Sequence, residues 1–211
     1  MVKEEPTVAE LEAIRATSFF GWYLIGLYPD GDPGDVGAWI LHCNGEAMLL
    51  EVPEGLRVEH VGEALKATDS RLKYITASHV HYDHLDEEVW FNLGRKYGRA
   101  PYCVQPIIPG EVNQPRTVYL GSEPVYIIPC PKHSVCDIIT IFRGVAMTGD
   151  IELGTLDSVT KEVPMKRRKQ SFENAARFFD DMDYQVHTVI SAHVNDIRTN
   201  VDWPKLFRAE S

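Results

Sequence analysis

The side chains that most clearly indicate chemistry lie in one short segment. Residues 76–86 read TASHVHYDHLD, which places four candidate metal ligands within six positions: His79, His81, Asp83 and His84. Histidine makes up 8 of the 211 residues, so three at a fixed spacing arise by chance in about one such chain in a hundred. Neutral imidazole and carboxylate are ligands that zinc, iron and manganese prefer. The segment therefore predicts a metal site.

The spacing within this segment favours two ions. The segment follows an apolar stretch typical of a strand, and side chains two residues apart on an extended chain point the same way. We therefore expect His79, His81 and Asp83 to converge. His84 breaks this period as a helix begins, so it faces another point. Ligands aimed at two points indicate two ions, which need further ligands from elsewhere in the chain.

Three further candidates follow later apolar stretches. His133 lies in PCPKHS, Asp150 ends VAMTGD, and His193 ends VISAH. One histidine or aspartate after a strand is usually a turn or cap residue, so each counts only together with the others. With the first segment they bring the candidate ligands to seven.

Two of the four cysteines, Cys130 and Cys136, stand three residues on either side of His133. Zinc accepts thiolate ligands, but free cysteine more often packs inside a protein, so we expect buried structural thiols. The first six residues contain no apolar stretch of the kind that a secretory signal needs. These features predict reduced thiols and a cytoplasmic location.

The elements that must position these residues follow from local patterns. Asn44-Gly45 between two apolar stretches, 36–43 and 47–52, predicts a hairpin. Val58, Val61 and Leu65 have the spacing of one helix face. Acidic residues 86–88 favour the start of a second helix, because they complement its dipole. The remaining expected elements are a loop over 30–34, strands over 21–28, 72–77, 102–105, 117–120, 125–128, 137–142, 145–147 and 187–191, and helices over 170–182 and 203–207.

This order of strands and helices predicts a mixed α/β structure. We expect residues 1–17 to form an N-terminal arm and residues 18–211 a single domain. The composition is that of an ordinary globular domain, with 44% hydrophobic and 25% charged residues. The longest nearly apolar run, residues 19–28, is too short to cross a bilayer.

The charge pattern limits the partners. A formal net charge of −10 disfavours binding to nucleic acid. The basic cluster Lys166-Arg167-Arg168-Lys169 is expected to be a solvated entry to the third helix. We therefore expect a small-molecule substrate, no nucleic acid and no membrane. The sequence makes no prediction of the oligomeric state.

Taken in order, HVHYDH, PCPKHS, MTGD and SAH resemble the motifs of the metallo-β-lactamase superfamily, over roughly residues 18–195. The resemblance implies a four-layer αβ/βα sandwich with a metal site at one edge of two packed sheets. It also implies two divalent ions, with zinc preferred and iron or manganese as alternatives. By motif position, one ion would be held by His79, His81 and His133, the other by Asp83, His84 and His193, and Asp150 would bridge them.

The chain departs from the family pattern in places. Lys132 stands where a glycine is frequent, Ala192-His193-Val194 replaces Gly-His-Gly, and residues 51–55 read EVPEG where Asp-Thr-Gly is common. No departure removes a ligand. They do leave the chain without an assignment to a characterised subfamily.

The implied activity is metal-dependent hydrolysis of a small ester, lactone or thioester by a hydroxide held between two ions. Asp83 is the candidate catalytic residue, because a carboxylate beside the attacking water can orient it and pass on its proton. One alternative is an iron-dependent oxygenase of the persulfide-dioxygenase type, with His79, His133 and Asp150 as the ligands of a single iron. Another is a non-enzymatic di-iron oxygen or redox sensor, although His81 stands where such proteins usually have glutamate.

Overall fold

The computed structural model describes residues 23–27, 36–99, 103–182, 184–193 and 197–207. The expected arm over 1–17 and the expected loop over 30–34 lie outside the described residues, so the division into an arm and one domain stays a prediction. The chain divides into two compact units, each of which contains one β-sheet with its helices. Among the described residues, no helix is both long and apolar enough to cross a bilayer.

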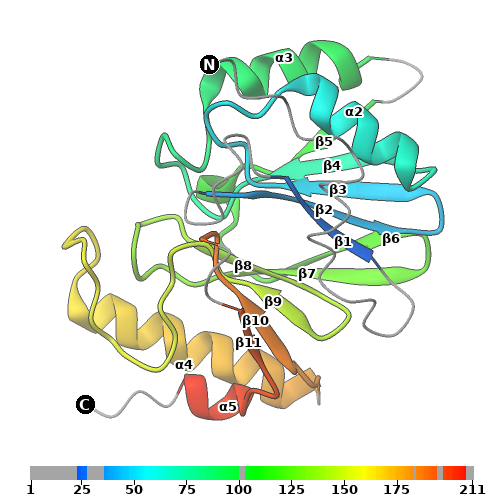
Figure 1. The fold of residues 1–211 in the computed structure, drawn as a ribbon. Helices are drawn as coiled ribbons and strands as arrows, with labels where there is room; N and C mark the ends of the chain where they lie inside the picture. The colour runs from blue at the N-terminus through cyan, green and yellow to red at the C-terminus, as the bar shows by residue number, and fades with distance from the viewer. Residues whose placement is uncertain (1–22, 28–35, 100–102, 183, 194–196, 208–211) are drawn as a thin grey trace. The chain divides into compact units, whose positions relative to one another are not determined.

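Helices are interspersed among the strands of the two sheets along the chain (Figure 1). The first sheet has the strand order β1-β2-β3-β4-β5, and the second has the order β11-β10-β9-β8-β7-β6. In chain order the elements are β1 (Tyr23–Leu27), β2 (Ala38–Cys43), β3 (Glu46–Leu50), α2 (Val58–Ala67), β4 (Arg71–Thr76), α3 (Glu87–Tyr97), β5 (Gln105–Pro106), the 3-10 helix η1 (Pro109–Glu111), β6 (Arg116–Leu120), β7 (Glu123–Pro129), β8 (Ile138–Phe142), β9 (Val145–Met147), α4 (Met165–Met182), β10 (Thr188–Ile190), β11 (Ile197–Thr199) and α5 (Trp203–Leu206).

In the first unit, the hairpin and the crossover that follows it set the strand ends. Asn44 and Gly45 join antiparallel β2 and β3 with positive φ angles of 51° and 75°, as a tight primed turn requires. The chain then returns through α2 to β4, which pairs parallel with β3. Parallel strands end at the same edge of a sheet, and there the Glu51 N–H donates to the Thr76 carbonyl over 3.0 Å. The segment after β3 therefore lies beside the start of the histidine-rich segment.

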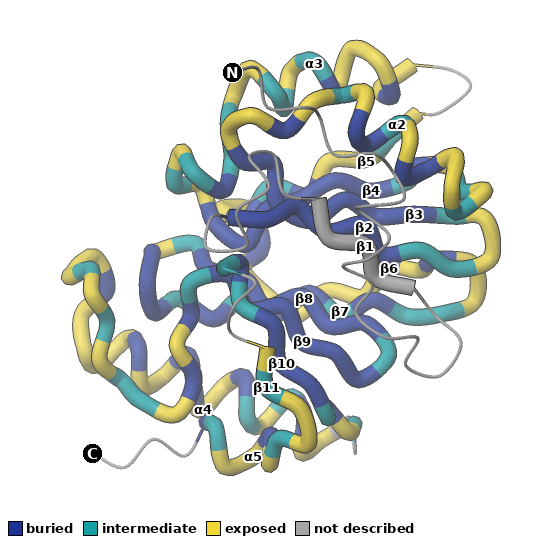
Figure 2. The backbone as a smooth tube through the Cα atoms, in the orientation of Figure 1, coloured by how far each residue is buried: buried dark blue, intermediate teal, exposed yellow. Residues whose placement is uncertain are grey.

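The core of the first unit lies between its sheet and the helices α2 and α3. The predicted helix faces are confirmed, because the residues that were expected to point inward are buried or half-buried against the strands. Figure 2 shows β2, β3 and β4 as mostly buried, whereas α2 and α3 also carry exposed residues. The helix residues in this core are Val58, Val61, Ala64, Leu65, Val89, Trp90, Leu93 and Tyr97.

In the second unit, a helical crossover between parallel strands again brings two strand ends to the same edge of the sheet. β7, β8 and β9 form an antiparallel meander, and α4 then leads back to β10, which pairs parallel with β9. Met147 is opposite Ile190 in this pairing. The segments that follow these two residues therefore leave the same edge of the sheet, and they carry Asp150 and His193.

Aromatic packing holds α4 and α5 together in this unit. Phe179 lies edge-on to Trp203 with ring centroids 5.0 Å apart, and Phe172 lies edge-on to Phe207 at 5.3 Å. All four rings are buried with Ile139, Ile141 and other strand residues. Such a cluster supplies a large part of the apolar burial that stabilises a domain of this size.

Two expectations need correction. α4 begins at Met165, five residues before the expected start at 170, so the basic cluster is part of the helix. Arg168 is also buried rather than solvated, and its guanidinium donates to the Leu156 and Thr160 carbonyls. Consecutive cations oppose the dipole at a helix start, so local pattern gave no sign of this first turn. The short strand β11 was not expected, because its exposed edge residues show no apolar alternation.

Asp86 caps the helix that follows the histidine-rich segment. Its Oδ1 accepts the Val89 N–H over 2.8 Å, and its own N–H donates to the Val52 carbonyl over 2.8 Å. We predict that Asp86→Ala lowers the free energy of unfolding by about 1 kcal/mol, because one N-terminal N–H loses its acceptor. Asp86→Asn should retain most of this stability. Urea denaturation checks both, with the exposed first-turn residue Glu88→Ala as control, and equal stability of Asp86→Ala and Glu88→Ala would contradict the cap.

Candidate metal centre

His79 is buried at the start of the histidine-rich segment, directly after β4. Its ring Nδ1 is 3.0 Å from the Ser78 hydroxyl. The Ser78 carbonyl accepts the Ile138 N–H of β8 over 2.8 Å. The backbone on the N-terminal side of His79 is thus held by β8, and its ring is held by the neighbouring hydroxyl.

His133 lies in the turn between β7 and β8, and this turn is folded around one carboxylate. Asp137 Oδ2 accepts the backbone N–H groups of Lys132, His133 and Ser134 over 2.8, 2.6 and 2.8 Å. Asp137 Oδ1 accepts the Ser134 hydroxyl over 2.6 Å. Burial raises the pKa of Asp137, while these four hydrogen bonds oppose that shift.

Asp150 brings a carboxylate to two histidines. Its Oδ2 is 3.7 Å from His133 Nε2, and its Oδ1 is 3.6 Å from His193 Nε2. Two donor atoms bound to one tetrahedral zinc ion, at bond lengths of about 2.0–2.1 Å, stand about 3.3 Å apart. The observed separations exceed hydrogen-bonding distance and are near this value, so they suit donors that share a metal ion.

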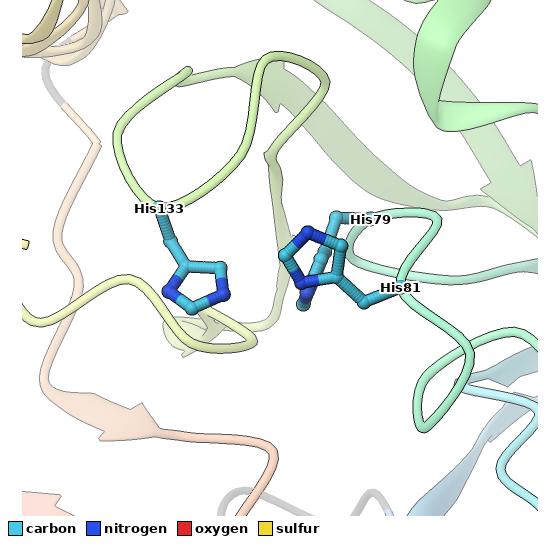
Figure 3. Close-up of side chains that lie close together, drawn as sticks. All are labelled: His79, His81 and His133. Atoms are coloured by element: carbon cyan, nitrogen blue, oxygen red, sulfur yellow. The ribbon is translucent and has the colours of Figure 1, made fainter. Parts of the chain in front are cut away.

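Two histidine rings of the second unit lie close together. The ring centroids of His79 and His133 are 5.1 Å apart, in an edge-on arrangement. Figure 3 shows these two rings together with His81, which follows His79 by two residues. His79, His81 and His133 form one group of potential metal ligands, and His79, His84 and Asp150 form another.

His84 is buried and is held by a carboxylate that the sequence patterns did not single out as functional. Its Nδ1 is 3.4 Å from Glu51 Oε2, and its Nε2 is 3.7 Å from Asp83 Oδ2. Glu51 is itself buried and has a left-handed φ of 67°. A carboxylate behind an imidazole fixes the orientation of the ring and raises its basicity as a ligand. The only sequence signal was an acidic residue at the end of the strand that pairs with β4.

The predicted ligands differ in exposure. His79 and His84 are buried, whereas the side chains of Asp83 and His193 are 42% and 43% exposed. Asp83 lies beside His84, with 3.7 Å between Asp83 Oδ2 and His84 Nε2, and its expected convergence with His79 and His81 stays a prediction. The assignment of each ligand to one of two ions stays a prediction.

Lys132 occupies the position where the family motif often has glycine. It is almost completely buried, its Nζ donates to the Glu152 carbonyl, and it lies 5.7 Å from the centroid of the Phe172 ring. Burial lowers the pKa of Lys132 to about 8, against the opposing effect of the nearby Glu152 carboxylate. The hydroxyl of Thr160 also donates to the His133 carbonyl. The segment after Asp150 is thereby fastened to the turn that carries His133.

The two cysteines near His133 differ in burial. Cys130 is buried, and this burial raises the pKa of its thiol, which disfavours the thiolate form that a metal needs. Cys136 is half-buried, with its sulfur 3.5 Å from the Ser134 hydroxyl. All four cysteines of the chain are free thiols. The expected buried structural thiol is confirmed for Cys130.

The comparisons with known proteins concern the fold. No protein-family model and no curated protein matches the sequence. A B3 metallo-β-lactamase with an active-site glutamic acid is similar over 96% of this chain and 91% of its own, at 12% identity and a TM-score of 0.61. The match to ETHE1 from Myxococcus xanthus covers 87% of this chain and 82% of that protein, at 14% identity and a TM-score of 0.61. The match to the DIM-1 metallo-β-lactamase covers 93% of this chain and 97% of that protein, at 16% identity and a TM-score of 0.59. With its two sheets, its helices and its cluster of histidines, the chain therefore has the mixed α/β fold of the metallo-β-lactamase superfamily that its motifs predict.

Proposed function

We propose that this protein is a metal-dependent hydrolase that acts on a small ester, lactone or thioester. The observation that carries this proposal is the position of Asp150, whose two carboxylate oxygens lie 3.7 and 3.6 Å from His133 and His193. Similar solved structures include metallo-β-lactamases, whose name denotes hydrolysis of a lactam. We further propose a small-molecule substrate and a cytoplasmic location.

The donor set fits divalent metal ions, because it combines imidazole nitrogens with carboxylate oxygens. When bound, such ions lower the pKa of a coordinated water from about 15.7 to about 7 and polarise a substrate carbonyl. Zinc is the preferred ion, with iron and manganese as alternatives. One ion would be held by His79, His81 and His133, a second by Asp83, His84 and His193, and Asp150 would contribute to both.

The chain's own residues would prepare this chemistry. Asp83 has an accessible carboxylate beside His84, so it can orient an attacking water and accept its proton at an Oδ atom. Glu51 holds the ring of His84 from behind, and Ser78 holds that of His79. These fixed orientations reduce the rearrangement that the reaction requires.

A second candidate function rests on three of the same residues. His79, His133 and Asp150 lie together, with 5.1 Å between the two ring centroids and 3.7 Å between His133 Nε2 and Asp150 Oδ2. Two imidazoles and one carboxylate also suit a single iron in an oxygenase. One iron per chain, together with oxygen uptake in the presence of a persulfide, would favour this function over hydrolysis.

Metal content tests the proposal directly. We predict that chelator-treated protein, dialysed against zinc and then against metal-free buffer, holds two zinc ions per chain by elemental analysis. His133→Ala and His84→Ala should each lower this number, because each removes one donor, while His60→Gln on α2 should leave it unchanged. Wild-type protein that retains only traces of zinc, iron or manganese would overturn the proposal.

Asp83 has two proposed roles, as a metal ligand and as an acceptor of the water proton, and the second is tested in protein whose metal content is known. We predict that Asp83→Asn lowers kcat for a hydrolysed ester, lactone or thioester by about 10²- to 10⁴-fold, because an amide cannot accept the proton. The measurement is made in excess zinc, with the bound metal determined in the same sample. Asp86→Asn, three residues away, is the matched control and should keep its activity. Full turnover by metal-loaded Asp83→Asn would show that the carboxylate has no such role.

A further inference from the structure

The turn that carries His133 is built around the buried carboxylate of Asp137. It runs from Cys130 to Asp137, and the Cys130 N–H donates to the Asp137 carbonyl over 2.8 Å to close it. The carboxylate of Asp137, only 2% exposed, then accepts three backbone N–H groups and one hydroxyl from residues 132–134. These donors have one common acceptor, so its loss would leave several buried polar groups without a partner, which is costly.

The same turn is tied to the segment that carries Asp150. Lys132, 1% exposed, sends its side chain to the carbonyl of Glu152, two residues after Asp150. A glycine at position 132 has no side chain with which to make this link. The Thr160 hydroxyl adds a second link by donating to the His133 carbonyl.

From these contacts we propose that Asp137 and Lys132 are positioning residues that set His133 against Asp150 and thereby determine the metal affinity of the site. Asp137 fixes the shape of the turn, and Lys132 fixes its distance from the segment after Asp150. The two ligand atoms that they align are 3.7 Å apart. The inference rests on the proposed metal-dependent function, because it concerns how the donors of that site are held.

Neither residue is itself placed to bind the metal. The carboxylate oxygens of Asp137 already accept four hydrogen bonds. The Lys132 side chain is directed to Glu152 and the Phe172 ring. Both residues therefore act through His133, as outer partners of metal ligands commonly do.

The test measures metal binding by the full-length chain, without any substrate. We predict that Asp137→Asn and Lys132→Met each weaken zinc binding by about 10- to 100-fold in competition with a chelating dye, as loss of an outer partner typically does. The visible absorption of the cobalt-loaded protein should also change in both, because the ligand geometry around the ion changes. Ser134→Ala, which removes one of the four hydrogen bonds, is the milder variant if Asp137→Asn does not fold.

The control is Val189→Ala, a buried residue of β10 that is opposite Ala146 of β9 and is none of the residues that hydrogen-bond to Asp137 or Lys132 in the turn. It should lower stability while leaving zinc affinity and the cobalt spectrum unchanged. If the wild type binds zinc and the variants of Asp137, Ser134 and Lys132 bind it equally well, with the same spectrum, the inference is wrong and the proposed function stands. Weakening no greater than that of Val189→Ala would also overturn it. A wild type that binds no metal would overturn both.

Discussion

Parallel strand pairing is the constraint on which the candidate site depends. In each unit, one crossover helix makes two strands run in the same direction, β3 with β4 and β9 with β10. The carboxyl ends of each pair therefore meet at one edge of their sheet. This brings Glu51 beside the start of the histidine-rich segment, and it brings the segments with Asp150 and His193 together. Residues far apart in the chain become neighbours because of the direction of the strands, which depends on backbone pairing rather than on contacts between their side chains.

Burial of polar groups is the second requirement, and it accounts for one departure from the family motifs, the lysine at position 132. A buried carboxylate or ammonium group is costly unless hydrogen bonds replace its lost hydration. The Asp137 carboxylate accepts four hydrogen bonds, and the Lys132 ammonium group donates one to the Glu152 carbonyl. The lysine that replaces a frequent glycine thus has a defined partner. The fold alone is compatible with several chemistries, so the activity has to be inferred from such details of the site.

Much of the fold follows from local patterns in the sequence. The turn at Asn44-Gly45, the inward faces of α2 and α3, and most strands were predictable, because turn chemistry and hydrophobic periodicity act over a few residues. The candidate ligands were also recognisable, since each lies in a short motif at the end of an apolar stretch. The start of α4 was missed because the contacts of Arg168 with Leu156 and Thr160 stabilise it, and these are not local signals.

The amino-acid sequence by itself determined which residues can act as ligands, the order of most elements and the resemblance to one superfamily. Only the tertiary structure decided how those ligands are held. Glu51 faces His84, and Lys132 reaches the carbonyl of Glu152, across 33 and 20 positions of the chain. Asp83 places a carboxylate oxygen 3.7 Å from His84 Nε2. Contacts of this kind depend on strand pairing and on the burial of polar groups, which no pattern of neighbouring residues encodes.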